Sequence, residues 1–276
     1  MFNKRSKNKV IIRLKGGLGN QLFQFNYGFI LSNQHKIDIF YDSKTGFETD
    51  FYRRSAFDSM FSINGFNKYS GVFSNLTLLR LFKILNKYIK TSVFRWIYIN
   101  EDQNSLKNFR ANLRSNNYYI EGYFQDNSII NKNYLNVLNE KLFNVSVNDL
   151  DEELLIIHYR SDQFDHTLSF DYYEKSVVYF IEKFKINKVI IYSDSKKVEE
   201  LSNYLNIQCG LNLHIETNWE DIAPEILLRK FISARYFIGS NGTFSFWACL
   251  LGTGRFVYSP YINDNFTSSQ NSYFSH

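Results

Sequence analysis

Apolar and polar positions along the chain follow the pattern of a parallel α/β protein. An apolar run at 10–14 is followed by a glycine turn, by apolar residues at helical spacing over 21–33, and by a second apolar run at 37–42. The spacing predicts a strand, a helix and a strand, which together form a βαβ unit with two parallel strands.

The middle of the chain has a less regular pattern. Residues 43–70 mix glycine, serine and asparagine with aromatic residues and predict no regular element. The helical period of 75–98 predicts the longest helix of the chain, and 116–126 predicts a strand and a turn. The polar run at 144–153 is the best candidate for a junction between two domains.

The second half of the chain alternates regularly between strand and helix periods. Strand-like apolar runs occur at 154–159, 188–193, 213–216, 234–239 and 255–259, and helical runs occur near 171–185, 196–205, 221–233 and 243–251. This alternation predicts a doubly wound α/β domain with a parallel sheet. With the N-terminal βαβ unit, it predicts an α/β protein of two domains, 1–145 and 146–276.

Composition narrows the class of protein. Hydrophobic residues make up 44% of the 276 positions and charged residues 21%, which is typical of a globular protein. The net charge of +5 is modest, and the basic residues mostly alternate with acidic ones. A nucleic-acid-binding protein more often carries a concentrated basic stripe, so we expect no nucleic-acid partner.

Cysteine usage and hydropathy bear on location. Cys209 and Cys249 form no CxxC pair and have no clustered histidines nearby, so a structural zinc site is not expected. The N-terminus lacks the apolar core of a signal peptide, and no run of about 18 uncharged apolar residues occurs. These features predict a soluble, cytoplasmic protein.

Polar residues gather where the predicted strands of the second half end. Arg160 follows the first strand in "HYRSD", Asp194 follows the second in "SDS", and the fourth strand runs into "GSNGTFS" at 239–245. Ligands of open parallel sheets bind beyond the carboxyl ends of the strands, so these residues form a candidate site.

This set of residues suits a nucleotide diphosphate. The guanidinium of Arg160 can donate two parallel hydrogen bonds to phosphate oxygens, and a helix that begins near Thr243 offers unpaired backbone N–H groups. The hydroxyls of Ser240, Thr243 and Ser245 add further donors. The Asp194 carboxylate can accept from a guanine edge or from a ribose hydroxyl. Taken singly, each feature also has a purely structural explanation. The serine-rich segments could cap the helices that follow them, and Arg160 could form an ion pair.

The glycine turn "KGGLGNQ" at 15–21 lies between a predicted strand and a predicted helix, where a dinucleotide could bind. The Rossmann fingerprint requires a further glycine at the position that Leu22 occupies here. Asp38 and Asp42 lie at about the right separation for a carboxylate that binds ribose. A nicotinamide-dependent oxidoreductase therefore stays open as an alternative.

The longer string "GGLGNQLFQF" at 16–25 resembles very closely the N-terminal motif of glycosyltransferase family 11, the α-1,2-fucosyltransferases. Four further motifs of that family have counterparts here in the same order: "GYFQ" at 122–125, a histidine-x-arginine motif at 158–162, an "SDD"-like motif at 193–195 and an "SNSSFSWW"-like motif at 240–247. The five matches span residues 10 to about 250.

The resemblance implies a GT-B architecture within the wider GDP-fucose fucosyltransferase superfamily. In that architecture two Rossmann-like domains face a central cleft, so 1–145 would lie on the acceptor side and 146–276 would bind the GDP-sugar. The resemblance also implies an inverting, metal-independent transfer of L-fucose from GDP-β-L-fucose, with no cofactor. It suggests O2 of a β-galactoside as the acceptor. The short chain without an N-terminal membrane anchor suggests a bacterial surface glycan such as an O-antigen.

The resemblance also assigns roles to single residues of the second half. Arg160 matches the arginine that neutralises the diphosphate, and His158 matches a histidine that contacts the donor. Asp194 matches the carboxylate near the guanosine. The residues that match the motif around the phosphates and the fucose are Ser240, Thr243, Phe244 and Ser245.

In the first half, Gly17, Gly19 and Asn20 match the loop that crosses the cleft toward the donor. The resemblance implies that the glycines let backbone approach the diphosphate or the sugar and that Asn20 hydrogen-bonds there. Asn20, Arg160 and Asp162 are thereby the candidate catalytic residues.

One motif departs from the family pattern. The family commonly has HxRRGD, with two adjacent arginines, whereas "HYRSD" has one arginine and is a residue shorter. Asp162 therefore aligns with the family aspartate only through a gap. Either Arg160 alone neutralises the diphosphate, or another cation such as Arg13, Lys15 or Arg229 contributes to its neutralisation. A changed sugar donor and a noncatalytic glycan-binding relative also stay open.

The base that deprotonates the acceptor hydroxyl is open among Asp162, Asp165 and His166, which follow the arginine motif. A solvated loop is the structural alternative for these residues, and a reaction without a dedicated base is the chemical one.

A second hypothesis concerns the predicted helix at 75–98. Arg80, Lys83, Lys87 and Lys90 are spaced 3, 4 and 3 residues apart, so they lie along one helical face. A basic amphipathic helix can lie on an anionic membrane surface, which would suit an enzyme that acts on a lipid-linked glycan. The ordinary alternative is a solvated outer face.

Overall fold

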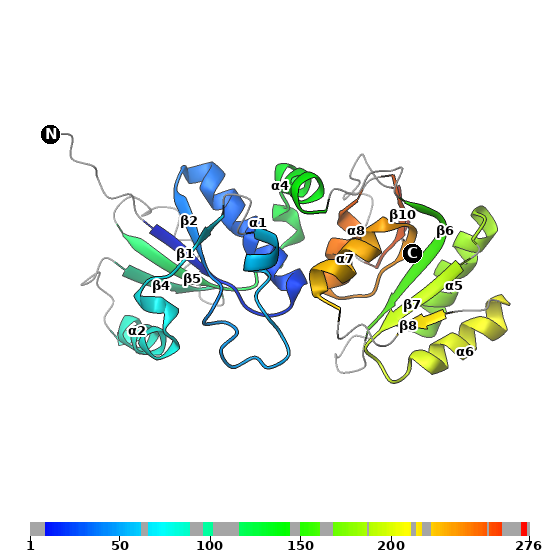
Figure 1. Ribbon diagram of the computed structural model, residues 1–276, viewed down its shortest axis with the longest axis horizontal. Helices are drawn as coiled ribbons and strands as arrows, with labels where there is room; N and C mark the ends of the chain where they lie inside the picture. Colours follow the sequence, from blue (N-terminus) through cyan, green and yellow to red (C-terminus); the bar gives the residue numbers. More distant parts are fainter. Residues whose placement is uncertain are drawn as a thin grey trace. The chain divides into compact units, whose positions relative to one another are not determined.

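A computed structural model describes residues 9–61, 66–88, 96–101, 116–143, 150–160, 168–186, 188–210, 214–216, 222–252, 254–260 and 272–274. The chain divides into two compact units, Met1–Tyr134 and Leu135–His276. Each unit is built around its own parallel sheet (Figure 1).

The first unit holds a five-stranded sheet in the order β3-β2-β1-β5-β4, and all its described pairings are parallel. Its strands are β1 (Lys9–Arg13), β2 (Asp38–Asp42), β3 (Asn67–Lys68), β4 (Trp96–Asn100) and β5 (Asn117–Glu121). Its helices are α1 (Leu18–His35) and α2 (Leu76–Tyr88), with short helical turns η1 (Phe57–Phe61), η2 (Val72–Ser74) and η3 (Asn127–Ile129). Helix α4 (Lys132–Val137) and turn η4 (Leu138–Phe143) follow.

Alternate residues of β1 pack against different helices, as the two-residue period of a strand requires. Ile11 belongs to a buried cluster with Leu79 of α2. Ile12 lies on the opposite face, where its Cδ1 would be 2.9 Å from a Cβ added at Gly28 of α1. The same Cβ would overlap the Tyr41 hydroxyl, so α1 can pack this closely only because residue 28 is glycine.

The second unit holds a six-stranded sheet in the order β11-β10-β9-β6-β7-β8, again with parallel described pairings. Its strands are β6 (Asp151–Tyr159), β7 (Lys188–Ser193), β8 (His214–Glu216), β9 (Ala234–Ile238), β10 (Phe256–Tyr258) and β11 (Ser272–Phe274). Its helices are α5 (Phe170–Lys183), α6 (Val198–Cys209), α7 (Pro224–Ser233) and α8 (Thr243–Leu250). Counted from β6, the order is 3-2-1-4-5-6, which is that of the Rossmann fold.

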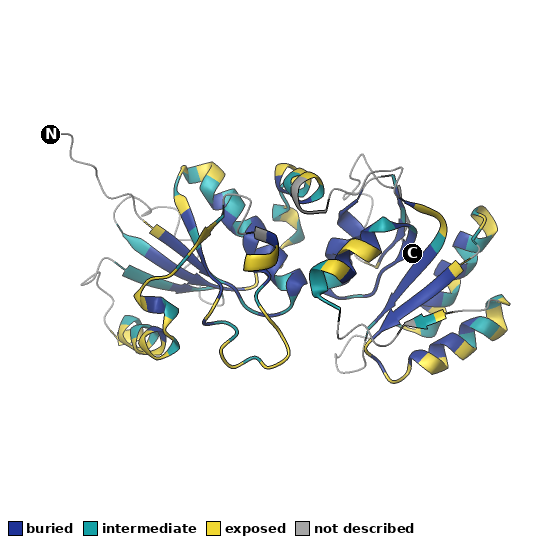
Figure 2. Cartoon of the chain, viewed as in Figure 1, coloured by how far each residue is buried: buried dark blue, intermediate teal, exposed yellow. Residues whose placement is uncertain are grey.

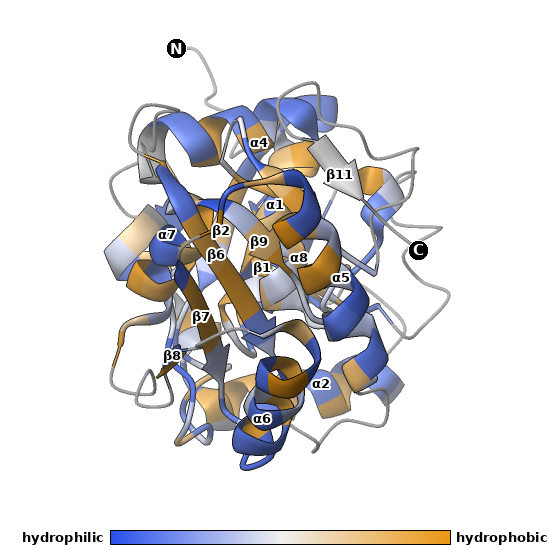
Figure 3. Ribbon diagram, turned by 90° about the vertical axis from the view of Figure 1, so that its right-hand side faces the viewer, coloured by the Kyte–Doolittle hydropathy of each residue, from blue (hydrophilic) through white to orange (hydrophobic). Residues whose placement is uncertain are grey.

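Helices cover both faces of the second sheet. Helices α5 and α6 lie on one face, and α7 and α8 lie on the other (Figure 1). The middle parts of the central strands β6 and β7 are apolar (Figure 3), as expected of strands that helices cover on both faces. Buried residues accordingly run through the sheet, and exposed residues lie on the outer sides of the helices (Figure 2).

A buried arginine ties α7 and α8 to the sheet. Arg255 is only 1% exposed, and its guanidinium donates to the carbonyl oxygens of Phe231, Ala234, Ala248 and Leu251 at 2.7–2.9 Å. These carbonyls lie at the C-terminal ends of both helices, where backbone acceptors lack intrahelical partners and the helix dipole favours a cation.

The helices and strands predicted for the second half are confirmed, with boundaries that shift by a few residues. The helix predicted over 75–98 is wrong at its end, because Trp96–Asn100 form β4; the described part of α2 is Leu76–Tyr88. The sequence "WIYIN" is rich in aromatic and β-branched residues, which favours a strand. Of the polar run at 144–153, residues 144–149 lie outside the described residues and Asp151 begins β6.

Candidate active site

The second sheet reverses its strand order between β6 and β9, so the connections that follow these neighbouring strands diverge. Ligands of doubly wound proteins bind in the crevice at such a switch point. Arg160 directly follows β6, and the loop at 239–242 leads from β9 into α8. The structure therefore brings the arginine motif and the serine-rich motif to one edge of the sheet, as the sequence predicts.

His158 joins the end of β6 to the start of α8 through buried hydrogen bonds. Its Nδ1 lies 2.6 Å from Ser245 Oγ and 3.3 Å from Ser240 Oγ, and the two hydroxyl oxygens are 3.0 Å apart. Ser245 Oγ also accepts from the backbone N–H of Ser240 at 2.8 Å. The three side chains together fix the shape of the loop after β9.

The surroundings of His158 keep its imidazole neutral. Burial, followed by the positive charge of Arg160, lowers the pKa of His158 to about 3. A neutral imidazole carries one N–H and one acceptor nitrogen, so it can fix a hydroxyl without adding charge. Of these two neighbouring side chains, Arg160 therefore carries the positive charge.

Arg160 lies against the backbone that opens α8. A Cβ added at Gly242 would come within 2.5 Å of Arg160 Nη1 and 3.2 Å of its Cζ. Gly242 directly precedes Thr243, the first residue of the helix. A guanidinium and a helix N-terminus are both positive, so their proximity favours a bound anion between or beside them. This is the arrangement expected of a phosphate site.

The motif at the start of α8 divides into buried and partly exposed members. Ser240 and Ser245 are 1% and 0% exposed, since their hydroxyls are engaged with His158. Thr243 and Phe244 are partly exposed. The Phe244 ring packs with its centroid 5.9 Å from that of His158. Of the four residues of this motif that the resemblance assigns to the phosphates and the fucose, Thr243 and Phe244 are thus the partly exposed ones.

Asp194 lies in the turn after β7, the neighbour of β6 on the side away from β9. Backbone N–H groups of Ser195 and Lys197 donate to Ser193 Oγ at 2.9 Å and to Ser195 Oγ at 3.1 Å. The serines therefore form the turn that leads into α6, and the Asp194 side chain is exposed at the same carboxyl edge of the sheet.

In the first unit, the glycine motif forms the turn from β1 into α1. Gly16 has a φ of +78°, which favours glycine, and a Cβ there would come within 2.7 Å of Asn20 Nδ2. Gly17 is extended and partly exposed, and a Cβ on it would meet nothing within 4 Å. Gly19 is buried in the first turn of α1. The backbone therefore requires glycine at 16, whereas at 17 the backbone lies beside open space.

Polar side chains of the same motif hold this turn in place. Gln24 accepts from the backbone N–H of Lys15 at 3.1 Å and donates to the carbonyl of Gly122 at 2.9 Å. Asn20 Oδ1 accepts from Gln125 Nε2 at 2.8 Å. Since residues 122 and 125 belong to "GYFQ", the two motifs of the first half are joined by hydrogen bonds.

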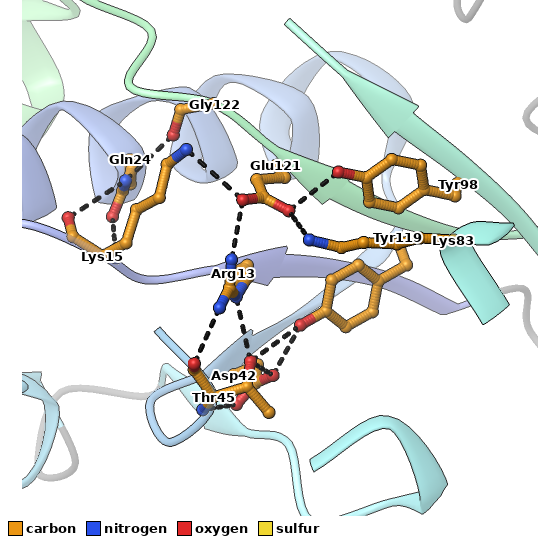
Figure 4. A network of polar contacts seen from close by, with 10 residues as sticks. All are labelled: Arg13, Lys15, Gln24, Asp42, Thr45, Lys83, Tyr98, Tyr119, Glu121 and Gly122. Carbon is orange, nitrogen blue, oxygen red and sulfur yellow. Dashed lines mark hydrogen bonds and ion pairs between the residues drawn. The ribbon is translucent and has the colours of Figure 1, made fainter. Parts of the chain in front are cut away.

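Glu121, at the end of β5, is a carboxylate shared by three cations (Figure 4). It accepts from Arg13 Nη1 at 2.7 Å, from Lys15 Nζ at 3.4 Å and from Lys83 of α2. The Tyr98 hydroxyl donates to it at 2.8 Å. Burial alone would raise the pKa of Glu121, but Arg13 and Lys83 lower it to about 2. Sequence reasoning missed this network, because its members lie far apart along the chain.

The outer face of α2 differs from the predicted basic face. Lys83 turns inward to Glu121, and Lys90 lies outside the described residues. Apart from Thr77 in the first turn, the exposed side chains that form an outward stripe along the helix are apolar: Leu78 (44%), Leu81 (52%), Ile84 (55%), Leu85 (47%) and Tyr88 (76%). At about 100° per residue, the exposed Arg80 and Lys87 lie together on one flank of this stripe.

The candidate bases Asp162, Asp165 and His166 lie outside the described residues. Within the described residues, no three His, Cys, Asp or Glu side chains gather to hold a metal ion. Of the described helices, none is both long and apolar enough to span a membrane.

The sequence matches no protein-family model and no curated protein sequence. Solved structures do resemble the chain. A mutant of Arabidopsis thaliana FUT1 in complex with GDP has a TM-score of 0.56 at 12% identity, over 96% of this chain and 73% of that one. The fucosyltransferase NodZ from Bradyrhizobium has a TM-score of 0.51 at 14% identity, over 90% and 93%. The NodZ α-1,6-fucosyltransferase soaked with GDP-fucose has a TM-score of 0.52 at 12% identity, over 90% and 94%.

These likenesses establish the fold. With its two parallel sheets, the chain has the GT-B fold of glycosyltransferases, which confirms the predicted fold class.

Proposed function

We propose that this protein is an inverting glycosyltransferase that moves L-fucose from GDP-β-L-fucose to a glycan, as the resemblance to glycosyltransferase family 11 implies. The observation that carries the proposal is the position of Arg160 against Gly242 at the start of α8, at the switch point of the second sheet. The GDP and GDP-fucose in the FUT1 and NodZ structures support a guanine nucleotide as the ligand. In this proposal 146–276 bind the donor and 1–145 bind the acceptor.

The residues at the switch point would act on the leaving group. As the bond between the fucose and the β-phosphate breaks, negative charge grows on GDP, and Arg160 and the N–H groups that open α8 stabilise it. The Thr243 hydroxyl adds a neutral donor, and Asp194 binds the guanosine. Loss of the Arg160 side chain would cost on the order of 3–4 kcal/mol in the transition state, as for other preorganised donors to developing charge.

The acceptor oxygen would attack from the face opposite to GDP, which inverts the anomeric centre. Asp162 is the proposed base for the hydroxyl proton, and a late transfer to solvent is the alternative. Gly17, Gly19 and Asn20 would bring the glycine turn of the first unit to the donor. The open space beside Gly17 supports a close approach of backbone to a ligand.

The proposed acceptor is O2 of a β-galactoside in a bacterial surface glycan such as an O-antigen, on the strength of the family resemblance. NodZ, which shares the fold, is an α-1,6-fucosyltransferase, so the fold leaves the linkage open. The linkage is decided by NMR of the product formed from GDP-fucose and a β-galactoside. A product linked to a hydroxyl other than O2 would contradict the α-1,2 assignment.

The donor is tested by isothermal titration of the purified protein with GDP, GDP-fucose and NAD, with EDTA present throughout. We expect micromolar binding of both guanine nucleotides and its loss in Arg160→Ala. Binding of NAD in place of GDP would instead favour the oxidoreductase. Turnover of another GDP-sugar would reveal a changed donor, and donor binding without turnover on any acceptor would favour a noncatalytic glycan-binding protein.

We further propose that the protein is cytoplasmic and contacts the inner face of the cell membrane through α2. An apolar stripe flanked by Arg80 and Lys87 matches a surface of anionic lipid, in which the leucines enter the headgroup region and the cations meet phosphates. Co-sedimentation with phosphatidylglycerol vesicles should exceed that with phosphatidylcholine vesicles and fall in Leu81→Asp. Ile207→Asp on α6 is the matched control, because Ile207 is 79% exposed on another helix. Equal sedimentation with both lipids would exclude the contact.

A further inference from the structure

A pocket of about 470 Å³ opens at the carboxyl edge of the first sheet. This sheet reverses its strand order between β1 and β5. The pocket is lined by Lys15 and Gly16, which follow β1, by Tyr123, which follows β5, and by Gly46 and residues 49–53, which follow β2. The first unit therefore has a switch-point pocket of its own, where ligands of such sheets bind.

The loop that follows β2 is held at both of its ends. The Asp42 carboxylate accepts from the Thr45 N–H at 3.1 Å and from the Thr45 hydroxyl at 2.6 Å. At the other end, Gln21 Oε1 accepts from the backbone N–H of Ala56 at 2.8 Å. Gly46 packs so closely on the backbone after β1 that a Cβ there would overlap a carbonyl oxygen. The loop is therefore anchored against the sheet.

Between these anchors the loop presents aromatic rings to solvent. Phe51 is 95% exposed and Tyr52 is 97% exposed. Asp50 Oδ1 accepts from the backbone N–H groups of Tyr52 and Arg53, both at 3.1 Å, so hydrogen bonds within the turn fix the segment that displays the rings. Tyr123 adds a third ring, 37% exposed. An aromatic face on a fixed backbone can bury the apolar C–H face of a sugar at little cost in entropy.

The pocket also carries an excess of positive charge. Arg13, Lys15 and Arg53 line it, together with a single carboxylate, that of Asp50. Arg53 lies 3.6 Å from Asp50, and behind the pocket Glu121 is shared by three cations (Figure 4). Among the residues that line the pocket, three cations outnumber one carboxylate, so an anionic group on a ligand would be stabilised here.

We infer that this pocket binds an acidic sugar of the acceptor. A carboxylate or phosphate on the sugar accepts charge-assisted hydrogen bonds from Lys15 and Arg53, while the ring packs on Phe51 or Tyr52. The inference rests on the proposed function, because it names the class of acceptor that a glycosyltransferase of this kind would use.

The test is an NMR titration of the full chain with three probes that share one ring: methyl β-D-galactoside, methyl β-D-galacturonide and methyl β-D-galactoside 6-phosphate. At least one charged probe should bind about tenfold or more tightly than the neutral one, since a hydrogen bond to a charged group contributes about 1.5–3 kcal/mol. The two charged probes distinguish a uronic acid from a sugar phosphate. Equal affinity for all three probes would overturn the inference.

Variants locate the binding. Lys15→Gln and Arg53→Gln should lower the affinity for the charged probe to that of the neutral one. Lys44→Gln is the matched control and should bind like the wild type, because Lys44 is an exposed cation of the same loop, paired with Glu48, that does not line the pocket. A similar loss of affinity for the charged probe in Lys44→Gln would mean that the effect comes from the overall positive charge of the protein. That result would contradict a defined site.

Titration with GDP in parallel separates this inference from the proposed function. Arg53→Gln should bind GDP like the wild type; Lys15, which the sequence leaves open as a cation for the diphosphate, is not used in this comparison. If Arg53→Gln loses GDP, the cation serves the nucleotide and the inference fails. If the wild-type protein binds no GDP but prefers the charged sugar, the proposed donor is wrong, while the inferred site for an acidic sugar is supported.

Discussion

Replacing Gly242 by alanine tests whether Arg160 holds the nucleotide from the position it has in the structure. The added methyl group would come within 2.5 Å of Arg160 Nη1 and 3.2 Å of its Cδ, so the side chain must move away. The backbone at Gly242 has a φ of −105°, which alanine adopts without strain. The perturbation therefore displaces one guanidinium and leaves the fold intact.

The magnitude follows from what the displaced group would bind. Hydrogen bonds to a charged phosphate contribute about 1.5–3 kcal/mol, so the Kd for GDP should rise by about 10- to 150-fold. The free energy of unfolding should change by less than about 0.5 kcal/mol, because a flexible, partly exposed side chain absorbs the clash. A large effect on binding with a small effect on stability is the expected signature.

The assay is calorimetric titration with GDP on the wild type, Gly242→Ala, Arg160→Ala and the double variant, with thermal unfolding of all four. Since the alanine acts through the arginine, the double variant should bind GDP no more weakly than Arg160→Ala alone. Wild-type affinity in Gly242→Ala, or two effects that simply add, would refute the reasoning.

Three further predictions concern stability. Gly16→Ala should lose about 1–2 kcal/mol in urea unfolding because its φ is +78°, whereas Gly17→Ala should match the wild type; equal values would contradict the strain argument. Glu121→Gln should lose about 3 kcal/mol at pH 7, because the folded pKa of about 2 lies below the ordinary 4.5. That stabilisation is present above pH 4.5 and disappears as the pH falls toward 2, so the Tm of the variant should fall less than that of the wild type below pH 4.5. The folded pKa of His158, about 3, lies below the ordinary 6.5, so the unfolded chain binds the proton first and wild-type stability should fall between pH 6.5 and 3. His158→Gln should show a shallower fall, and an unchanged slope would refute the assignment.

The carboxyl edge of the second sheet could be predicted from the sequence, because parallel strands place their ends together whatever their order. Arg160, Asp194 and the loop before Thr243 were found in this way. The periodicity of hydrophobic residues does not show which hydroxyl groups are buried. Ser240 and Ser245 are buried because His158 offers them a partner across the sheet, a contact between residues more than 80 positions apart.

The network around Glu121 shows a second limit. Spacing alone places Lys83 on a helical face with Arg80 and Lys87, but it does not say which way that face points. The orientation of Lys83 is set by the buried carboxylate of Glu121 at the end of β5. The two residues lie on different elements, 38 positions apart in the sequence. Such a pairing depends on tertiary contact and outweighs the local pattern. The aromatic and β-branched strand at Trp96–Asn100 was missed for a related reason, since it continues an apolar period that also fits a helix.

Arg255 has a consequence for the search for functional residues by random mutagenesis. It closes the far ends of α7 and α8 from inside the core, and at 1% exposure it cannot touch a ligand. Lysine has a single ammonium in place of the planar fork that reaches four carbonyls, so even this conservative change would loosen the helix whose first turn holds Arg160. In a screen scored only by lost transfer, position 255 would therefore be indistinguishable from a residue of the site. Only the amount of folded protein recovered from each clone would tell the two apart.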